Sequence, residues 1–205
     1  MTAAFLLHPT ARRTLYRSPF SLAPSPMNGL RLIPFAASLL MLVTPVVSSQ
    51  AQATFLDYRT TVPTGWVAAT PSSTMRLAEY RVPASGGAIP VEVVVYFFGP
   101  GQGGPPQANL DRWKSQFSNP AGGPVAETVR HETTGAFPLT IAEYSGTYAR
   151  GMGAGSSAEA ARPGHTLIAV VVETPRGTLF VQCFGPAAAV AAQKTAYLQF
   201  VRGLR

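Results

Sequence analysis

The pattern of apolar and polar positions predicts a protein built mainly from strands. Residues 55–62 are typical of a short strand that ends in a turn, and Trp66 follows as a large apolar anchor that can pack under a sheet. Residues 91–98, VEVVVYFF, are almost all β-branched or aromatic. Such a run predicts a strand buried on both faces.

Between these two segments, residues 75–82 alternate between apolar and polar, which predicts a half-exposed strand. The alternation places Met75, Leu77 and Val82 toward the core. It leaves three charged side chains largely in water: Arg76, Glu79 and Arg81.

Two segments have helical spacing instead. Leu110, Trp113 and Phe117 predict an amphipathic helix that begins just after Pro105 and Pro106, because proline is tolerated in a first helical turn. Residues 187–204 are rich in alanine and predict a closing helix. The large residues that share one side of it are Val190, Tyr197, Val201 and Leu204.

The remaining apolar runs predict two hairpins, residues 125–133 with 139–148 and residues 166–174 with 178–184. Successive hairpins favour antiparallel pairing, and strands that are apolar on both faces need a covering layer on each side. We therefore expect an α+β fold, a mainly antiparallel sheet of about six to seven strands flanked by two helices.

The N-terminal residues predict export. Residues 32–47 form an uncharged apolar run directly after Arg31, and the small-x-small triplet Ala51-Gln52-Ala53 follows a short polar stretch. This order is typical of a secretory signal peptide. We expect residues 1–53 to be an N-terminal extension and signal, cleavage to leave Thr54 at the mature N-terminus, and residues 54–205 to form a single globular domain.

Three alternatives remain open for this region. Translation could start at Met27, which begins a conventional signal by itself. Arg12-Arg13 could belong to a twin-arginine signal, although the apolar run begins far downstream of that pair. The segment could also stay uncleaved as a membrane anchor, although its sixteen residues contain Pro34 and Pro45 and fall short of the roughly 20 that span a bilayer.

The net charge of +7 suggests a nucleic-acid partner until it is divided along the chain. Four of the sixteen basic residues precede Thr54, whereas all nine acidic residues follow it, so residues 54–205 carry +3 without a basic run. The chain therefore loses the main feature of a nucleic-acid-binding protein. The lone Cys183 lies in an apolar run, where we expect a buried thiol, and it stands too far from the cleavage point for lipid attachment.

The glycine-rich segment from Gly99 to Gly104 matches G-x-G-x-x-G between a strand and a helix. The two prolines that follow it remove N–H donors that a dinucleotide pyrophosphate would need, and no parallel βαβ unit follows. We predict no cofactor. Because loops often carry binding, the candidate contact residues are glycines of this loop and of a second one: Gly99, Gly101, Gly104, Gly151 and Gly153.

Candidates for catalysis and metal binding are sparse. His131 and Glu132 begin like the zinc motif H-E-x-x-H, but Gly135 occupies the place of the second histidine, and His165 lies far along the chain. We predict no metal site. No G-x-S-x-G marks a serine nucleophile. The residue types a hydrolase would need, Ser145, His165 and Asp111 or the carboxylates Glu79, Glu92, Glu143 and Glu173, could meet only in the folded chain.

The strings MRLAEYRVP, VVVYFFGPGQGG, NLDRWKSQF and VVETPRGTLFVQCFGP resemble those of a group of uncharacterised exported bacterial proteins, over most of residues 57–202. More distantly, VPTGW, a late hairpin around ETPRGTLF and the terminal helix resemble the PsbP-like domain. That resemblance implies an α/β/α sandwich and a non-enzymatic accessory role in larger complexes. It transfers no functional residue to this chain.

These observations favour an exported, periplasmic or extracellular accessory domain that binds an unknown protein or small ligand without catalysis. Its contact with a membrane would be transient, through the signal peptide. The alternatives are a periplasmic hydrolase whose site forms only in three dimensions and an envelope protein that keeps its N-terminal anchor.

Overall fold

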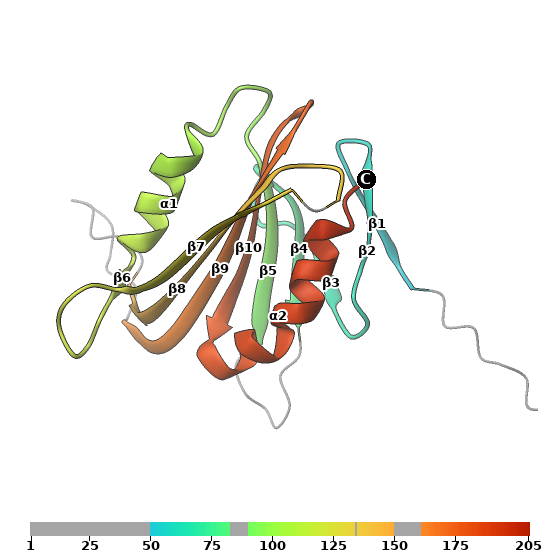
Figure 1. The fold of residues 1–205 in the computed structure, drawn as a ribbon. Coiled ribbons are helices and arrows are strands. Elements are labelled where there is room, and N and C mark those ends of the chain that lie inside the picture. Colours follow the sequence, from blue (N-terminus) through green and yellow to red (C-terminus); the bar gives the residue numbers. More distant parts are fainter. Residues whose placement is uncertain (1–49, 83–89, 134, 150–160) are drawn as a thin grey trace, which may run out of the picture. The chain divides into compact units, whose positions relative to one another are not determined.

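The computed structural model describes residues 50–82, 90–133, 135–149 and 161–205 (Figure 1). The predictions for residues 1–49, and for Gly151 and Gly153, lie outside these ranges. The elements, in chain order, are β1 (Gln52–Phe55), β2 (Tyr58–Thr61), β3 (Val67–Ala69), β4 (Arg76–Val82), β5 (Val91–Phe97), α1 (Pro106–Lys114), β6 (Phe117–Ser118), β7 (Ala126–Glu132), β8 (Leu139–Tyr148), β9 (Arg162–Thr174), β10 (Gly177–Pro186) and α2 (Ala187–Arg202).

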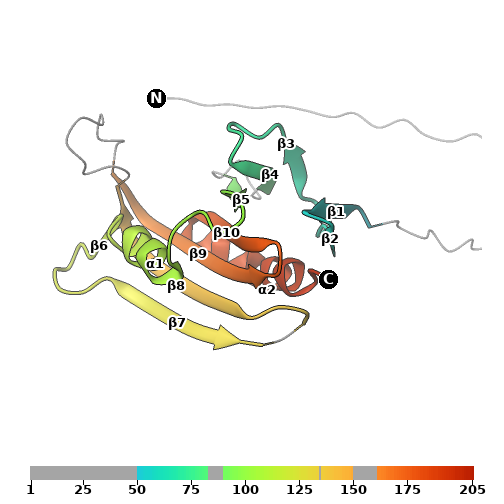
Figure 2. The ribbon, with the colours of Figure 1, turned by 90° about the horizontal axis from the view of Figure 1, so that it is seen from above.

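Eight strands form one antiparallel sheet in the order β3-β4-β5-β10-β9-β8-β6, and β7 also pairs with β8. Figure 2 shows β7 at the outer edge beside β8. β1 and β2 form a separate two-stranded sheet. The α+β class is confirmed. The sheet exceeds the expected six to seven strands because β3 and β6 have only three and two residues, too few for an alternation pattern to reveal.

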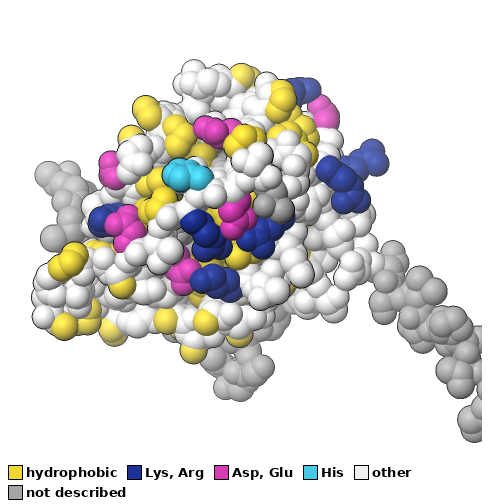
Figure 3. Space-filling view, viewed as in Figure 1, with side chains coloured by type: hydrophobic (Ala, Val, Ile, Leu, Met, Phe, Trp, Pro, Cys, Tyr) yellow, Lys and Arg dark blue, Asp and Glu magenta, His cyan; other side chains and the backbone are white. Residues whose placement is uncertain are grey.

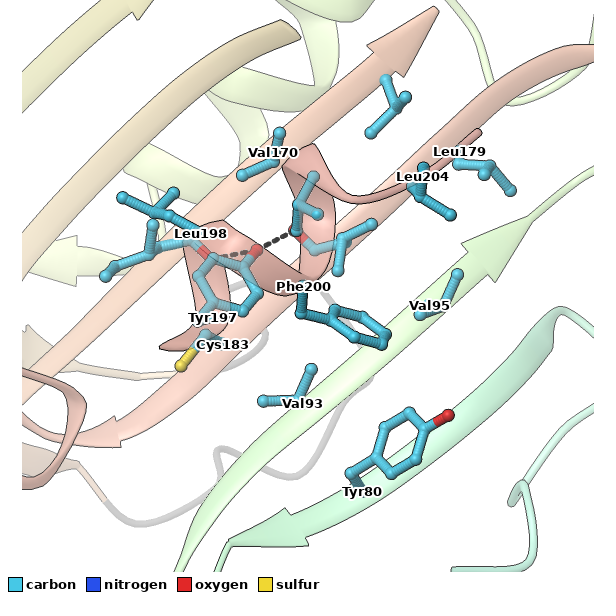
Figure 4. Packing of buried hydrophobic residues seen from close by; sticks show 14 of the residues in the cluster. Tyr80, Val93, Val95, Val170, Leu179, Cys183, Tyr197, Leu198, Phe200 and Leu204 are labelled. Carbon is cyan, nitrogen blue, oxygen red and sulfur yellow. Dashed lines mark hydrogen bonds between the residues drawn. The ribbon is translucent and has the colours of Figure 1, made fainter. Parts of the chain in front are cut away.

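Alternation along the long strands builds two separate cores. On one side, which we call the α2 face, Val93, Val170 and Val181 pack with α2 and the β1–β2 hairpin (Figure 4). On the other side, the α1 face, Ala169, Val171 and other sheet residues pack with α1. Both predicted helices are confirmed, and each begins directly after a proline that has an extended backbone. The first is shorter than expected: α1 ends at Lys114, so Phe117, predicted on the helix, lies in β6.

The centre of the α2 face is held by Tyr197. Its buried hydroxyl lies 2.8 Å from the carbonyl of Val181 and 3.2 Å from that of Ile168 (Figure 4). Cys183 is fully buried in the same core, as expected, and burial raises the pKa of its thiol to about 12. A thiol that stays protonated in an apolar core serves as packing.

The N-terminal strand differs from its prediction. Two strands, β1 and β2, occupy the segment where the sequence predicts one, because Leu56 and Asp57 both adopt positive φ, 51° and 80°, and reverse the chain. Hairpin turns with two positive φ values usually contain asparagine or glycine, so the turn has no strong sequence signal. Trp66 is buried as predicted and lies against Tyr80 and Phe200.

The side-chain assignment along β4 was partly wrong. Val82 is buried, Leu77 packs against the core and Arg81 is exposed, as expected, but other positions differ. A bulge between Arg76 and Ala78 shifts the register, so that alternate residues exchange faces along the strand. Met75 is 49% exposed instead of lying in the core, whereas Glu79, expected in water, is 6% exposed on the α1 face. Among the described residues, no helix has the length and apolar character to cross a membrane.

Candidate functional site

The α1 face is only partly covered by its helix. Leu110 and Trp113 of the nine-residue α1 lie over the sheet, with the Trp113 ring 5.9 Å from that of Phe180. α1 ends at Lys114, so in the described ranges the part of this face formed by β5, β10 and the start of β9 has no covering helix. A pocket opens there.

The pocket has a volume of about 140 Å³. Its floor is formed by one residue from each of three neighbouring strands, Val94 of β5, Gln182 of β10 and Leu167 of β9. All three project to the same side of the sheet. The remaining residues that line it are Arg76, Glu92, Tyr96, Gln116, Tyr148, Arg162 and Phe184. We call these ten residues the sheet pocket.

One wall is built around Arg76. Its Nη1 donates to Glu79 Oε2 and to Glu92 Oε1, both at 2.9 Å, and its guanidinium carbon lies 5.4 Å from the centre of the Tyr96 ring. The β4 bulge makes this possible because it puts Arg76 opposite Tyr96 on the pocket side. The arginine is therefore fixed in orientation by two carboxylates and a ring.

The electrostatics of this wall favour the charged forms. Burial would raise the pKa of Glu79, but hydrogen bonds from Arg76 and from the backbone N–H of Ser72 outweigh it and hold that pKa below its usual value. Burial would likewise lower the pKa of Arg76, while the nearby Tyr96, Glu92 and Glu79 raise it overall. Both shifts favour an ionised Arg76–Glu79 pair at neutral pH.

The opposite wall depends on the end of β8. Tyr148 pairs with Arg162 of β9, and the Ala149 N–H donates to the Gln116 carbonyl at 2.8 Å, so these residues meet at one rim. The chain reaches this position through Gly146, where an added Cβ would lie 2.4 Å from the Ser118 carbonyl oxygen. Only glycine permits this approach of β6 to β8.

Aromatic rings connect the two walls. The ring of Tyr148 lies 4.5 Å from that of Phe184, which is 5.4 Å from the buried His165. His165 Nδ1–H donates a hydrogen bond to the Pro163 carbonyl at 2.9 Å, and its Nε2 is buried without a partner in the described chain. Rings and carbon surfaces therefore supply the apolar part of the pocket.

The charges around the sheet pocket balance. Arg76 and Arg162 carry two positive charges, and Glu79 and Glu92 carry two negative ones. Gln116 and Gln182 add amides, each with donor and acceptor groups. Among the residues that the structure describes, the arrangement therefore offers planar hydrogen-bonding groups beside rings, without a surplus of either charge.

The glycine loop between β5 and α1 has a structural role. Gly99, Gly101 and Gly104 have positive φ, and none of them lines the sheet pocket. Their neighbour Gly103 also has positive φ, and an added Cβ there would lie 2.8 Å from the Phe180 ring. The loop therefore needs glycine to turn the chain tightly over the sheet.

The serine, histidine and aspartate that a hydrolase would need are not joined to one another by hydrogen bonds. Two of the four candidate carboxylates, Glu79 and Glu92, do meet, because both accept from Arg76. Ser145 is hydrogen-bonded to Thr166. His131, on the edge strand β7, is hydrogen-bonded to Thr140 of β8. Asp111 accepts from Gln107 on the exposed side of α1. Within the described ranges, no three residues among His, Cys, Asp and Glu are grouped as a metal site would need.

Ion pairs on the surface tie elements to each other. Arg202 of α2 donates to Glu132 of β7, which also accepts from Arg130, and Lys194 of α2 pairs with Glu143 of β8. Hydrogen bonds from Arg130 and Arg202 lower the pKa of Glu132. Figure 3 shows basic and acidic side chains interleaved on this view of the surface, a mixed pattern without a large region of one charge.

Local sequence pattern does not reveal the sheet pocket, because its residues are spread over the chain. They come from β4, β5, β9 and β10, from Gln116 just before β6 and from Tyr148 at the end of β8. The available signal was the set of charged residues on strands that are otherwise apolar, Arg76, Glu79 and Glu92. Alternation by itself places these side chains in water. Arg76 and Glu79 are largely buried because of the bulge in β4, whereas the Glu92 side chain stays 41% exposed and reaches Arg76 from the neighbouring strand.

No family model matches the sequence, and no curated protein matches it. Among solved structures, the chain is similar to cyanobacterial PsbP (CyanoP) from Synechocystis sp. PCC 6803, with 13% identity, a TM-score of 0.46, and coverage of 81% of this chain and 98% of that one. It is also similar to PA94 from Pseudomonas aeruginosa, a protein of unknown function, with 15% identity, a TM-score of 0.41, and coverage of 76% and 96%. The PsbP-like resemblance suggested by the sequence is thus also found in the comparison of structures.

Proposed function

We propose that this chain is an exported accessory domain that binds a small, uncharged polar ligand in the sheet pocket, without catalysis. The observation that carries the proposal is the mixed lining, in which two arginines, the carboxylate of Glu92 and two amides surround aromatic rings. Glu79, which does not line the pocket, pairs with Arg76 and balances the second positive charge. A saccharide ring has the matching chemistry, because its hydroxyl groups both donate and accept while one of its faces is apolar.

The size of the pocket supports a small ligand. Its volume of about 140 Å³ is below the ~300–1,000 Å³ of pockets that hold drug-sized molecules. A single sugar ring or a similar polar ring is therefore a better fit than a long chain or a nucleotide.

The charge balance argues against an anionic ligand. Arg76, the most central basic group, already donates to Glu79 and Glu92, so a carboxylate or phosphate would have to compete with two existing ion pairs. A neutral ligand avoids that competition and can accept from or donate to the exposed edges of the same groups.

The absence of catalysis is supported by the pocket residues. No serine, cysteine, histidine, lysine or aspartate is among the ten residues that line it. Glu92 is its one lining carboxylate and is held by Arg76. The pocket therefore offers groups that orient a ligand and lacks the nucleophile-and-base arrangement of a hydrolase.

The experiment is a titration of ¹⁵N-labelled protein with glucose and N-acetylglucosamine, followed by NMR. We expect saturable shifts of backbone signals from β5, β10 and the start of β9, with millimolar affinity. Sodium phosphate and sodium benzoate, added at matched ionic strength, should give no saturable shifts at these signals. Gln182→Ala should weaken the sugar response at least tenfold, whereas Gln107→Ala on exposed α1 should leave it unchanged.

Three results would contradict the proposal. Preferential binding of phosphate or benzoate would assign the pocket to anions. No saturable response to either sugar, in protein whose spectrum shows it to be folded, would remove the saccharide assignment. Turnover of an ester, glycan or peptide that is lost in a pocket variant would replace the binding role by an enzymatic one.

A further inference from the structure

The first strand of the domain begins before the cleavage point that the sequence pattern favours. β1 runs from Gln52 to Phe55, and all four of its residues pair with β2. Cleavage after Ala53 would remove half of this strand, together with the hydrogen bond of 3.0 Å that Gln52 Nε2 donates to Thr61.

Ala53 is part of the core as well as of the strand. It is 9% exposed and belongs to the same buried cluster as Phe55 and Phe200 on the α2 face. Cleavage before Thr54 would delete this side chain and place a charged amino group within the hairpin, next to Arg59, its partner in the register. Both changes would weaken the packing of the hairpin.

Two residues upstream the situation differs. Ala51 and Gln50 are exposed and precede the strand. Ser49-Gln50-Ala51 is a second small-x-small triplet, so it meets the same requirement for signal peptidase as the triplet that ends at Ala53. The chain thus contains two overlapping cleavage motifs, and only one of them leaves β1 whole.

We infer that signal peptidase hydrolyses the bond between Ala51 and Gln52, so that the mature protein begins at Gln52. Water adds to the Ala51 carbonyl carbon and the C–N bond breaks, which leaves a carboxylate on Ala51 and the amino group on Gln52. This inference rests on the proposed export of the chain. It replaces Thr54 as the mature N-terminus.

The cleavage costs one hydrogen bond of the hairpin. The Val62 N–H donates to the Ala51 carbonyl at 2.8 Å, and that acceptor leaves with the signal. Because Ala51 is exposed at the open end of the hairpin, water can take its place. Cleavage after Ala53 loses the same bond, and in addition two residue pairs and a buried side chain.

Two substitutions separate the motifs, since each motif needs small residues at its first and third positions. Ser49→Leu changes only the motif that ends at Ala51, and Ala53→Leu changes only the motif that ends at Ala53. The full-length chain, expressed with its own N-terminus in a bacterium, is recovered from the periplasm or medium. Mass spectrometry of the intact protein and of its N-terminal peptide then identifies the first residue.

We expect the unchanged chain and Ala53→Leu to begin at Gln52, and Ser49→Leu to lose that product. Because processing is the readout, any folding defect caused by leucine at position 53 does not affect the conclusion. A mature N-terminus at Thr54 would overturn this inference and leave the proposed export intact. A chain that remains whole inside the cell would overturn both.

Discussion

The two faces of the sheet are built from the same strands, but their covering layers differ in extent. On the α2 face, the sixteen-residue α2, the β1–β2 hairpin and Trp66 combine into one continuous core. On the α1 face, the nine-residue α1 covers only part of the sheet, and the sheet pocket occupies the remainder. A covering layer that is too short leaves a concave, partly polar surface on a rigid support.

This difference separates stability from recognition. The α2 face buries large side chains such as Tyr197 and Phe200, and their packing holds the sheet together. The α1 face also holds charged groups, Arg76 and Glu79, beside the pocket. These side chains are partly buried, so each needs an oppositely charged partner to offset the cost of desolvation. We expect substitutions on the two faces to have different consequences.

The largest effect should follow loss of a ring from the α2 face. Phe200 is 1% exposed and contacts the rings of Phe55, Trp66 and Tyr80, so Phe200→Ala should lower the free energy of unfolding by about 3–5 kcal/mol. Phe184→Ala, in the partly exposed wall of the sheet pocket, should lower it by only about 1–2 kcal/mol. Urea unfolding followed by fluorescence measures both. Equal losses would contradict the division between the faces.

A smaller effect is expected from single hydroxyl groups. Tyr197→Phe leaves the Ile168 and Val181 carbonyls without this donor and should cost about 1–2 kcal/mol. Tyr144 on the α1 face is the matched control, because its buried hydroxyl has no partner in the described structure. Tyr144→Phe should therefore be neutral or slightly stabilising.

The hydroxyl of Tyr144 remains protonated at ordinary pH, since burial, together with Glu127 and Asp111, raises its pKa to about 12. Its replacement thus removes a neutral polar group and no charge. Thermal unfolding of the two phenylalanine variants side by side gives the comparison. A loss at Tyr144 as large as the loss at Tyr197 would show that its hydroxyl has a partner after all.

The smallest effect concerns acid. The pKa of Glu79 is lower in the folded chain than its usual value of 4.5, so its stabilising contribution is complete above pH 4.5 and is lost as the pH falls through the lower folded value. Glu79→Gln should cost about 1 kcal/mol at pH 7. The difference from the unchanged protein should shrink steadily below pH 4.5. Urea unfolding across this range measures it, and a difference that does not change with pH would contradict an ionised Glu79.

Much of the architecture could be predicted from local pattern. The long strands β5, β9 and β10 are apolar on both faces, and this requires a layer on each side of the sheet wherever the chain folds. Trp113 and Tyr197 lie at helical spacing with their apolar neighbours, so both helices and their buried sides were predictable. Each of these properties is decided by a few residues that are close together in the sequence.

The sheet pocket could not be predicted in the same way. The bulge after Arg76 reverses the faces of β4, and an alternation pattern extended through it assigns Met75 and Glu79 to the wrong environments. The turn at Leu56 and Asp57 is a second case, because its positive φ values have no glycine to announce them. In both places a backbone irregularity is stabilised by packing that lies far away in the sequence.

By itself, then, the sequence determined the class of fold, the two helices and the buried position of Cys183, because hydrophobic periodicity acts over a few residues. Tertiary structure alone decided that Arg76, Tyr148 and Gln182 line one pocket and that Ala53 belongs to the core. Those relations depend on strand order, register and the packing of α2, which join residues more than a hundred positions apart. No local pattern carries that information.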